Sequence, residues 1–305
     1  MPEGGEELSP CDESAWMSDV RGVAYAAQTP EGELSLPDGV SQRFAPGEVL
    51  LFQTHYLNAT PEPLDATMHL ELDMVDPEEA PVEAGVFFFF NPVINVPPRG
   101  SSTSRLSCPI TDDVDLVFAV SHMHARGVGF GAEIEGNAAG SLYDVDDWDE
   151  PDSRVFAEGD PAARLAKGSV ISYACDFANP DDATFQAGPS ATTDEMCMFI
   201  GMYYPRLDTD TELCWSGLAE TKGTTSCLDT LACSRVCEES DDGCVADCIE
   251  QVCPNGAVPL MRFAQRVAPS CGETCASEDA ATCQACVISS CPDEALACQA
   301  ATCET

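Results

Sequence analysis

The chain has 305 residues and a formal net charge of −40, because 53 Asp and Glu stand against 13 Lys and Arg. This charge excludes nucleic acids and anionic membranes as partners, since both would repel the chain. The longest apolar run, residues 85–90, is strand-sized and far shorter than the roughly 20 residues that span a bilayer, so no membrane span is predicted. The length fits about two domains.

In chain order, residues 1–45 come first and are rich in Gly, Pro and acidic residues, with one strand-like piece at residues 23–26. From Val49 to about Pro205, short β-branched and aromatic runs alternate with turn-rich segments, and no helical pattern separates them. The strand-like runs are residues 49–52, 68–72, 86–90, 116–120, 170–173 and 197–204. Many short strands at this spacing predict a mainly β fold, a jelly-roll-like antiparallel β-sandwich.

Two of the four histidines, His122 and His124, lie two residues apart in the apolar, β-prone run 117–124. Side chains at this spacing share one face of a strand, so both imidazoles project into the same space. Met196, on a second predicted strand, would add a thioether, which is a soft ligand suited to Cu(I), while imidazole suits either oxidation state of copper. The spacing alone also fits a polar strand with ordinary surface histidines.

Cysteine usage points to an oxidising compartment. The chain has 18 cysteines, and 13 of them fall between Cys227 and Cys303, a stretch without histidine. A disulfide framework in an exported protein is the simplest interpretation. The sequence nevertheless opens Met-Pro-Glu-Gly-Gly-Glu-Glu, which has neither the basic nor the apolar region of a signal peptide.

The cysteine-rich tail is predicted to form small α-helical hairpins. Its first half has two Cys-x3-Cys pairs, and this spacing places both cysteines of a pair on one helical face. A shift of 38 residues brings most of these cysteines onto others in the second half, which is a degenerate internal repeat. The expected disulfides are Cys233–Cys248, Cys237–Cys244, Cys271–Cys286 and Cys275–Cys283. A zinc site of four thiolates is the alternative.

Several further motifs occur in one order over roughly residues 10–216. They are Leu36-Pro37-Asp38-Gly39-Val40, Gln53–Asn58, Pro97-Pro98, Cys108, His122-Met123-His124, Cys175, Thr193-Asp194-Glu195-Met196-Cys197 and Tyr203-Tyr204-Pro205. Together they resemble the copper type II, ascorbate-dependent monooxygenases, the family of peptidylglycine α-hydroxylating and dopamine β-monooxygenases. The resemblance covers about two thirds of the chain and is mainly to the C-terminal copper domain of that family.

The resemblance implies that His122, His124 and Met196 hold the methionine-liganded copper, where O2 binds and a substrate C–H bond is attacked. It also implies that His55 is a ligand of a second, all-histidine copper that relays electrons. In the family the partners of His55 are an adjacent His-His pair upstream, and this chain has no His-His. We therefore expect two coppers in the complete enzyme, one in this chain, and a missing N-terminal part that carried the pair and the signal peptide. The alternative is a short protein that has lost the electron-transfer copper.

Two more disulfides follow from the resemblance. Cys175–Cys197 would pin the strand of Met196, and Cys108–Cys214 would hold the C-terminal end of the domain, so that the metal ligands keep their geometry. Cys11 matches a cysteine whose partner lies upstream in the family. An odd number of cysteines remains in the tail, which implies a free thiol, a bond to Cys11 or an intermolecular link.

The expected domains are residues 1–57, the last strands of an N-terminal copper domain; residues 58–216, the C-terminal copper domain; and residues 217–305, the cysteine-rich tail. His69 matches no family ligand and is interpreted as structural. Gln53 lies on the strand face of His55 and is expected to join the hydrogen-bond path between the coppers.

At three positions where the peptide-amidating member of the family grips a substrate carboxylate, this chain has Val120, Met198 and Ile200. These apolar side chains offer no charge-assisted anchor, so the expected substrate is a rather apolar small molecule or peptide-like compound. The expected reaction is C–H hydroxylation with O2 and a one-electron reductant such as ascorbate. A non-catalytic, exported protein that binds a single copper is the competing hypothesis. In either case the tail is expected to contact a surface or protein partner.

Overall fold

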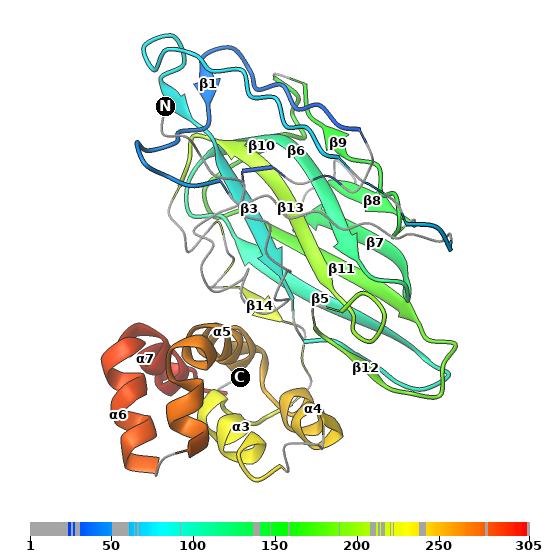
Figure 1. The fold of residues 1–305 in the computed structure, drawn as a ribbon, viewed down its shortest axis with the longest axis vertical. Helices are drawn as coiled ribbons and strands as arrows, with labels where there is room; N and C mark the ends of the chain where they lie inside the picture. Colours follow the sequence, from blue (N-terminus) through cyan, green and yellow to red (C-terminus); the bar gives the residue numbers. More distant parts are fainter. Residues whose placement is uncertain are drawn as a thin grey trace.

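The computed structural model describes residues 24, 25, 27, 31–50, 61–63, 65, 67–91, 93–136, 141–146, 148–157, 159–188, 190–207, 212, 214, 217–219, 221, 223–237, 242–277 and 280–303. Two antiparallel sheets form a β-sandwich, and a group of helices follows at one end of it, next to β14 (Figure 1). The predicted fold class, a mainly β sandwich with a disulfide-rich helical tail, is confirmed. The jelly-roll connectivity stays a prediction.

The first sheet contains both strands of the predicted copper site. Its strand order is β10-β6-β13-β3, and β9 pairs with β6 beside this path. Every pairing in it is antiparallel. The strands are β3 (Gly85–Phe90), β6 (Val114–Met123), β9 (Arg154–Val155), β10 (Arg164–Leu165) and β13 (Cys197–Tyr204).

The second sheet has the order β14-β5-β11-β7-β8 and is also antiparallel. Its strands are β5 (Ser101–Pro109), β7 (Gly127–Ile134), β8 (Tyr143–Val145), β11 (Val170–Ala178) and β14 (Leu218–Ala219). Two short pairs complete the β structure: β1 (Val40–Ser41) runs parallel to β2 (Val82–Glu83), and β4 (Asn95–Val96) runs antiparallel to β12 (Phe185–Gln186).

The core between the two sheets is aromatic and is centred on Phe199 of β13. Its ring centroid lies 5.2 Å from that of Phe87, 5.5 Å from that of Phe130 and 6.0 Å from that of Tyr173. These separations are typical of favourable aromatic pairs, and they place rings from both sheets in one cluster. The disulfide Cys175–Cys197 also crosses this core and joins β11 to β13.

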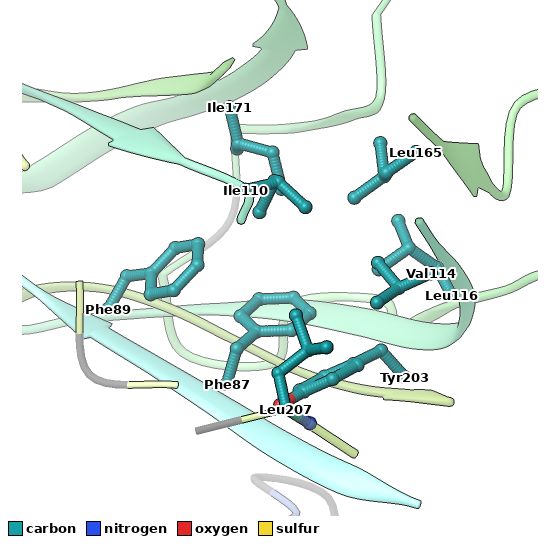
Figure 2. Close-up of a pocket in the computed structure, with 9 residues that line it drawn as sticks. All are labelled: Phe87, Phe89, Ile110, Val114, Leu116, Leu165, Ile171, Tyr203 and Leu207. Carbon is teal, nitrogen blue, oxygen red and sulfur yellow. The ribbon is translucent and has the colours of Figure 1, made fainter. Parts of the chain in front are cut away.

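A small apolar void lies in the same core, among Phe87, Phe89, Leu165, Tyr203 and neighbouring aliphatic side chains (Figure 2). Its volume is about 10 Å³, which is about what a single water needs. The Tyr203 hydroxyl donates to Glu212 Oε1 at 3.1 Å and accepts from the Leu207 amide at 3.0 Å. Burial raises the pKa of Tyr203 far above its ordinary value. Because its volume is only about 10 Å³, the void is a packing defect and is too small to hold a substrate.

Strand β13 is buried on both faces. Cys197, Phe199 and Tyr203 belong to the core between the sheets. Met198 and Ile200 alternate with them and belong to a second apolar cluster on the outer face of the sheet. This alternation follows from the two-residue period of a strand, and it explains why the run reads as almost continuously hydrophobic.

The N-terminal segment covers part of this outer face. Leu34, Leu36 and Val40 pack against the second cluster. The pairing of β1 with β2 fixes the segment, and the Ala84 amide donates to the carbonyl of Ser41 at 2.9 Å. Residues 34–40 therefore pack on the same sheet that carries His122 and Met198.

The tail consists of helices cross-linked by disulfides. Its first helix begins after Ser226, whose side chain accepts a hydrogen bond from the Asp229 amide at 3.2 Å, as is typical of a helix N-cap. The helices are α3 (Cys227–Ser234), α4 (Asp242–Glu250), α5 (Pro254–Ser277), α6 (Ala280–Ser290) and α7 (Pro292–Ala300). Among the described residues, none of the helices is long and apolar enough to cross a membrane.

Twelve of the 13 tail cysteines form six disulfides. Four are the expected pairs within the two hairpins, Cys233–Cys248, Cys237–Cys244, Cys271–Cys286 and Cys275–Cys283. The other two, Cys227–Cys298 and Cys253–Cys303, were not anticipated from the sequence. They connect the beginning of the tail with its end. The thirteenth cysteine, Cys291, is buried.

Three strand predictions need correction or remain open. Residues 68–72 form no strand, and their side chains are exposed, because within the described residues no neighbouring strand pairs with them. The described parts of the other two, residues 24, 25, 49 and 50, are also not in strands, and the remainder lies outside the described residues. Conversely, β5 and β7 were not predicted, because the first is rich in serine and the second in glycine, residues with weak strand preference.

Candidate metal centre

The predicted ligands lie in or next to two neighbouring strands: His122 is in β6, His124 directly follows β6, and Met196 directly precedes β13. In their antiparallel register, His122 lies opposite Met198 and Met123 lies opposite Cys197. His124 and Met196 lie one residue beyond this paired register, and its continuation would place them opposite each other. Residues directly opposite in an antiparallel pair share a face, and so do residues two apart on one strand. His122, His124 and Met196 therefore share the outer face at one end of the first sheet.

The separation of the two imidazole rings is compatible with one shared ion. Their centroids are 5.4 Å apart and the ring planes are at 89°. A ring nitrogen lies about 2.0 Å from a bound transition metal, so each centroid lies about 3.1 Å from it. Two rings that bind one ion at angles between tetrahedral and trigonal are then separated by about 5 to 5.5 Å. The observed separation lies in this range.

A hydrogen bond to the main chain fixes the ring of His124. Its Nδ1 lies 3.0 Å from the carbonyl oxygen of Asp194. A carbonyl oxygen only accepts, so Nδ1 carries the proton and donates it, which leaves Nε2 with the lone pair. This arrangement is typical of histidines that ligate metals, because the second nitrogen orients the ring and sets its tautomer. His124 itself is buried.

Met196 is held by the segment before it and the strand after it. The Asp194 amide donates to the Ser190 carbonyl at 2.9 Å, and the Glu195 amide donates to the Gln186 carbonyl at 2.8 Å. The residue after Met196 is Cys197, whose disulfide to Cys175 anchors the start of β13 across the core. The backbone on both sides of Met196 is thus constrained. Cys108–Cys214 is also present and ties the chain after β13 to β5.

A buried carboxylate lies beside the predicted ligands. Glu195 is 0 % exposed, and its Oε1 accepts a hydrogen bond from the Arg126 amide at 3.0 Å. The Arg126 guanidinium lies 3.7 Å from the same oxygen. Burial raises the pKa of Glu195, and the amide and charge of Arg126 act in the opposite direction. This pair joins the segment after His124 to the residue before Met196.

Arg126 extends the same connection to the loop before β13. Its guanidinium donates to the Thr192 carbonyl at 3.0 Å and to Asp181 Oδ2 at 3.1 Å, and it lies 3.7 Å above the ring of Phe185. The roles of Arg126 and Glu195 were not predicted from the sequence. The only signal was that Glu195 lies within the Thr-Asp-Glu-Met-Cys motif, directly before a buried strand.

The surroundings of the predicted site are apolar. Val120 lies opposite Ile200, two positions along the strands from His122 and Met198. Val120, Met198 and Ile200 are each less than 9 % exposed and belong to the same outer-face cluster as Met196. The donor set therefore consists of two nitrogens and one thioether beside an apolar surface, which suits a soft ion such as Cu(I).

The sequence also predicted a second copper ligand, His55, and an alternative zinc site in the tail. His55 and Gln53 lie outside the described residues, as does Cys11. Among the described residues, Cys237, Cys244 and Cys248 are the cluster of metal-ligating groups that lies close enough to share an ion. All three are in disulfides, which removes the thiolates that the alternative zinc site would need. His69 is exposed on the segment before β2.

The comparisons with known proteins concern the β-sandwich. No curated protein matches the chain. Residues 82–225, which contain both sheets of the sandwich, match the family model described as "Copper type II ascorbate-dependent monooxygenase, C-terminal domain". Residues 82–225, somewhat less than half of the chain, are therefore similar to the C-terminal domain of the copper type II ascorbate-dependent monooxygenases.

Proposed function

We propose that this chain hydroxylates a C–H bond of an apolar substrate, using copper held by His122, His124 and Met196. The balanced reaction converts R–H, O2, two electrons and two protons into R–OH and water, and two molecules of a one-electron reductant such as ascorbate supply the electrons. The observation that supports the proposal is the closeness of the His122 and His124 rings at the end of β6, beside the start of β13 that Met196 precedes. Copper, when bound, supplies the one-electron redox chemistry that protein side chains lack.

The chain's own residues position these donors. The Asp194 carbonyl holds the His124 ring with Nε2 available as a ligand. Glu195 and Arg126 tie the end of β6 to the start of β13. A site whose donors are held in place before the metal arrives loses less free energy to ordering and keeps the metal in one geometry.

The apolar face beside the donors determines the proposed substrate class. Val120, Met198 and Ile200 present no charged or hydrogen-bonding side chain to a bound molecule. A carboxylate placed there would lose its hydration without gaining a partner, which is costly. We therefore propose that the part of the substrate next to the reacting carbon is hydrocarbon, in a small molecule or a peptide-like compound.

The eight disulfides among the described residues support export to an oxidising compartment, outside the cell or in a periplasm. His55 as a ligand of a second, electron-relaying copper remains part of the proposal. A surface or protein partner for the helical tail is likewise proposed, on the basis of its rigid, cross-linked helices.

The test uses the full chain loaded with copper, with ascorbate and 18O2, against a panel of apolar compounds. The expected result is an 18O-labelled alcohol whose formation is abolished in His122→Ala and Met196→Leu. His69→Ala is the matched control, because His69 is exposed and should retain full activity. Stoichiometric copper binding without any labelled alcohol across the panel would support the non-catalytic copper protein instead. Failure to bind copper in either oxidation state would overturn both.

A further inference from the structure

Two histidine–methionine pairs lie next to each other across β6 and β13. His122 is opposite Met198, and the continuation of this register would place His124 opposite Met196. The sequence alone marks Met198 only as one of three apolar residues at positions where the peptide-amidating member of the family grips a carboxylate. Its register position, however, is equivalent to that of Met196: each thioether lies directly across from one of the two imidazoles.

The burial pattern indicates that both methionines face the same side. Met196 and Met198 belong to the outer-face cluster, whereas Cys197 between them belongs to the core between the sheets. Met198 is 2 % exposed and Met196 is 7 % exposed. Neither thioether therefore points into solvent, and both lie on the face from which His122 and His124 project.

The Met198 side chain is long enough and flexible enough to reach an ion beside His122. Opposite residues on antiparallel strands have Cβ atoms about 4.5–5.5 Å apart, so the Met198 side chain begins beside that of His122. Methionine is unbranched and has three rotatable bonds, which allow its sulfur to adapt to a nearby ion. On the described part of this face, the remaining neighbours Val120 and Ile200 offer no competing donor.

We infer that Met198 is a fourth ligand of the reduced copper, so that Cu(I) is held by two imidazoles and two thioethers. This inference rests on the proposed copper site of His122, His124 and Met196. Thioether sulfur is a soft donor that selects Cu(I). Met198 would therefore favour the reduced form of copper and occupy a coordination position that a three-ligand site leaves open, and its thioether would have to leave that position before the O2 of the proposed reaction could take it.

The consequence is measurable with carbon monoxide, a probe of open positions on Cu(I). A four-coordinate site binds carbon monoxide only when a ligand gives way, and a three-coordinate site binds it directly. Met198→Leu keeps the size and hydrophobicity of the side chain but removes the sulfur, and swaps of this kind are usually well tolerated in cores. This variant should therefore expose the position without unfolding the protein.

The experiment compares the full chain with three variants, each loaded anaerobically with one equivalent of Cu(I). Met196→Leu and Met198→Leu remove one thioether each. Met202→Leu is the matched control, because Met202 is in the same strand and cluster but lies opposite Phe118, far from the histidines. X-ray absorption counts the sulfur neighbours of copper, a competing chelator gives the Cu(I) affinity, and infrared spectroscopy detects bound carbon monoxide.

The expected result is two sulfur neighbours in the parent chain and in Met202→Leu, and one in each of the other two variants. Loss of even an outer partner typically costs 10- to 100-fold in metal affinity, so loss of Met198 should weaken Cu(I) binding by about tenfold or more. Carbon monoxide binding should rise in Met198→Leu. One sulfur neighbour in the parent chain, lost only in Met196→Leu, would overturn the inference and leave Met198 as a pocket wall, with the proposed function intact. If the parent chain bound no Cu(I), the proposed function itself would fall.

Discussion

The main-chain amide of Arg126 donates to the buried carboxylate of Glu195 at 3.0 Å, across 69 residues of sequence. Arg126 follows His124 by two residues, and Glu195 directly precedes Met196. This one contact therefore ties together the two segments that supply the predicted copper ligands. The contribution of this contact to folding stability and its contribution to copper binding can be measured separately.

Glu195→Ala should lower the free energy of unfolding of the metal-free protein by about 1–3 kcal/mol, because it leaves the Arg126 amide without its buried acceptor, while the guanidinium keeps its pair with Asp181. Glu195→Gln should be milder, since its amide oxygen still accepts from the Arg126 backbone. Urea unfolding of the metal-free forms and Cu(I) competition provide the two measurements. Asp182→Asn is the control, because Asp182 pairs with Arg99 on the exposed surface. This variant should change neither the free energy of unfolding nor the Cu(I) affinity. Equal unfolding midpoints for Glu195→Ala and the parent chain would contradict the prediction.

Removing the Cys175–Cys197 disulfide by a double substitution to alanine should cost about 3 kcal/mol of stability, given the 22-residue separation of its ends. It should also weaken copper binding, because Cys197 adjoins Met196. The corresponding removal of Cys237–Cys244 in the tail should leave copper affinity unchanged. Thermal unfolding and chelator competition test both parts. If the two double variants lost copper affinity equally, the proposed role of the disulfide in holding the site would be wrong.

Gly201→Ala should destabilise the sandwich by about 1–3 kcal/mol through overpacking. A Cβ at this position of β13 would overlap the ring of Phe87 and the carbonyl oxygen of Phe118. Gly129→Ala in β7 is the matched control, because its nearest atoms, on Asp176, are at 3.6 Å, an ordinary contact distance. Denaturant unfolding should show a clear loss for the first variant and little change for the second. A loss of similar size in both would mean that overlap with Phe87 is not the cause.

Within the tail, loss of the Cys227–Cys298 disulfide should be more damaging than loss of Cys237–Cys244. The first closes a separation of 71 residues and the second one of only 7. Loop-closure entropy gives about 4 kcal/mol for the long closure and about 2 kcal/mol for the short one. Hydrogen exchange of the tail helices in the two double-alanine variants measures the difference. Stronger protection in the Cys227–Cys298 variant would reverse the predicted order.

Local patterns were sufficient to predict part of the structure. The two-residue period placed His122 and His124 on one strand face, and the spacing of Cys233 and Cys237 indicated a cross-linked hairpin. Both arguments use only neighbours along the chain. The family resemblance, and not the spacing, connected these histidines with Met196.

Long-range relationships were beyond such reasoning. The contact of Glu195 with Arg126 joins distant residues, and a charged side chain is most often exposed, so nothing in the sequence marks Glu195 as buried. The pairing of Cys227 with Cys298 is one of many connectivities that the same cysteines allow. Strand β5 was missed because Thr103 and the serines around it owe their strand structure to pairing with β11 and not to their own propensity.

The alternation of β13 separates two kinds of selective constraint along a single strand. Substitutions at Phe199 and Tyr203 act on the aromatic core and must preserve the fold. Substitutions at Ile200 and Met202 change the outer face of the sheet near the donor atoms and leave that core untouched. A lineage with this strand can thus acquire new substrates by changing every second residue, while the intervening residues keep the sandwich intact.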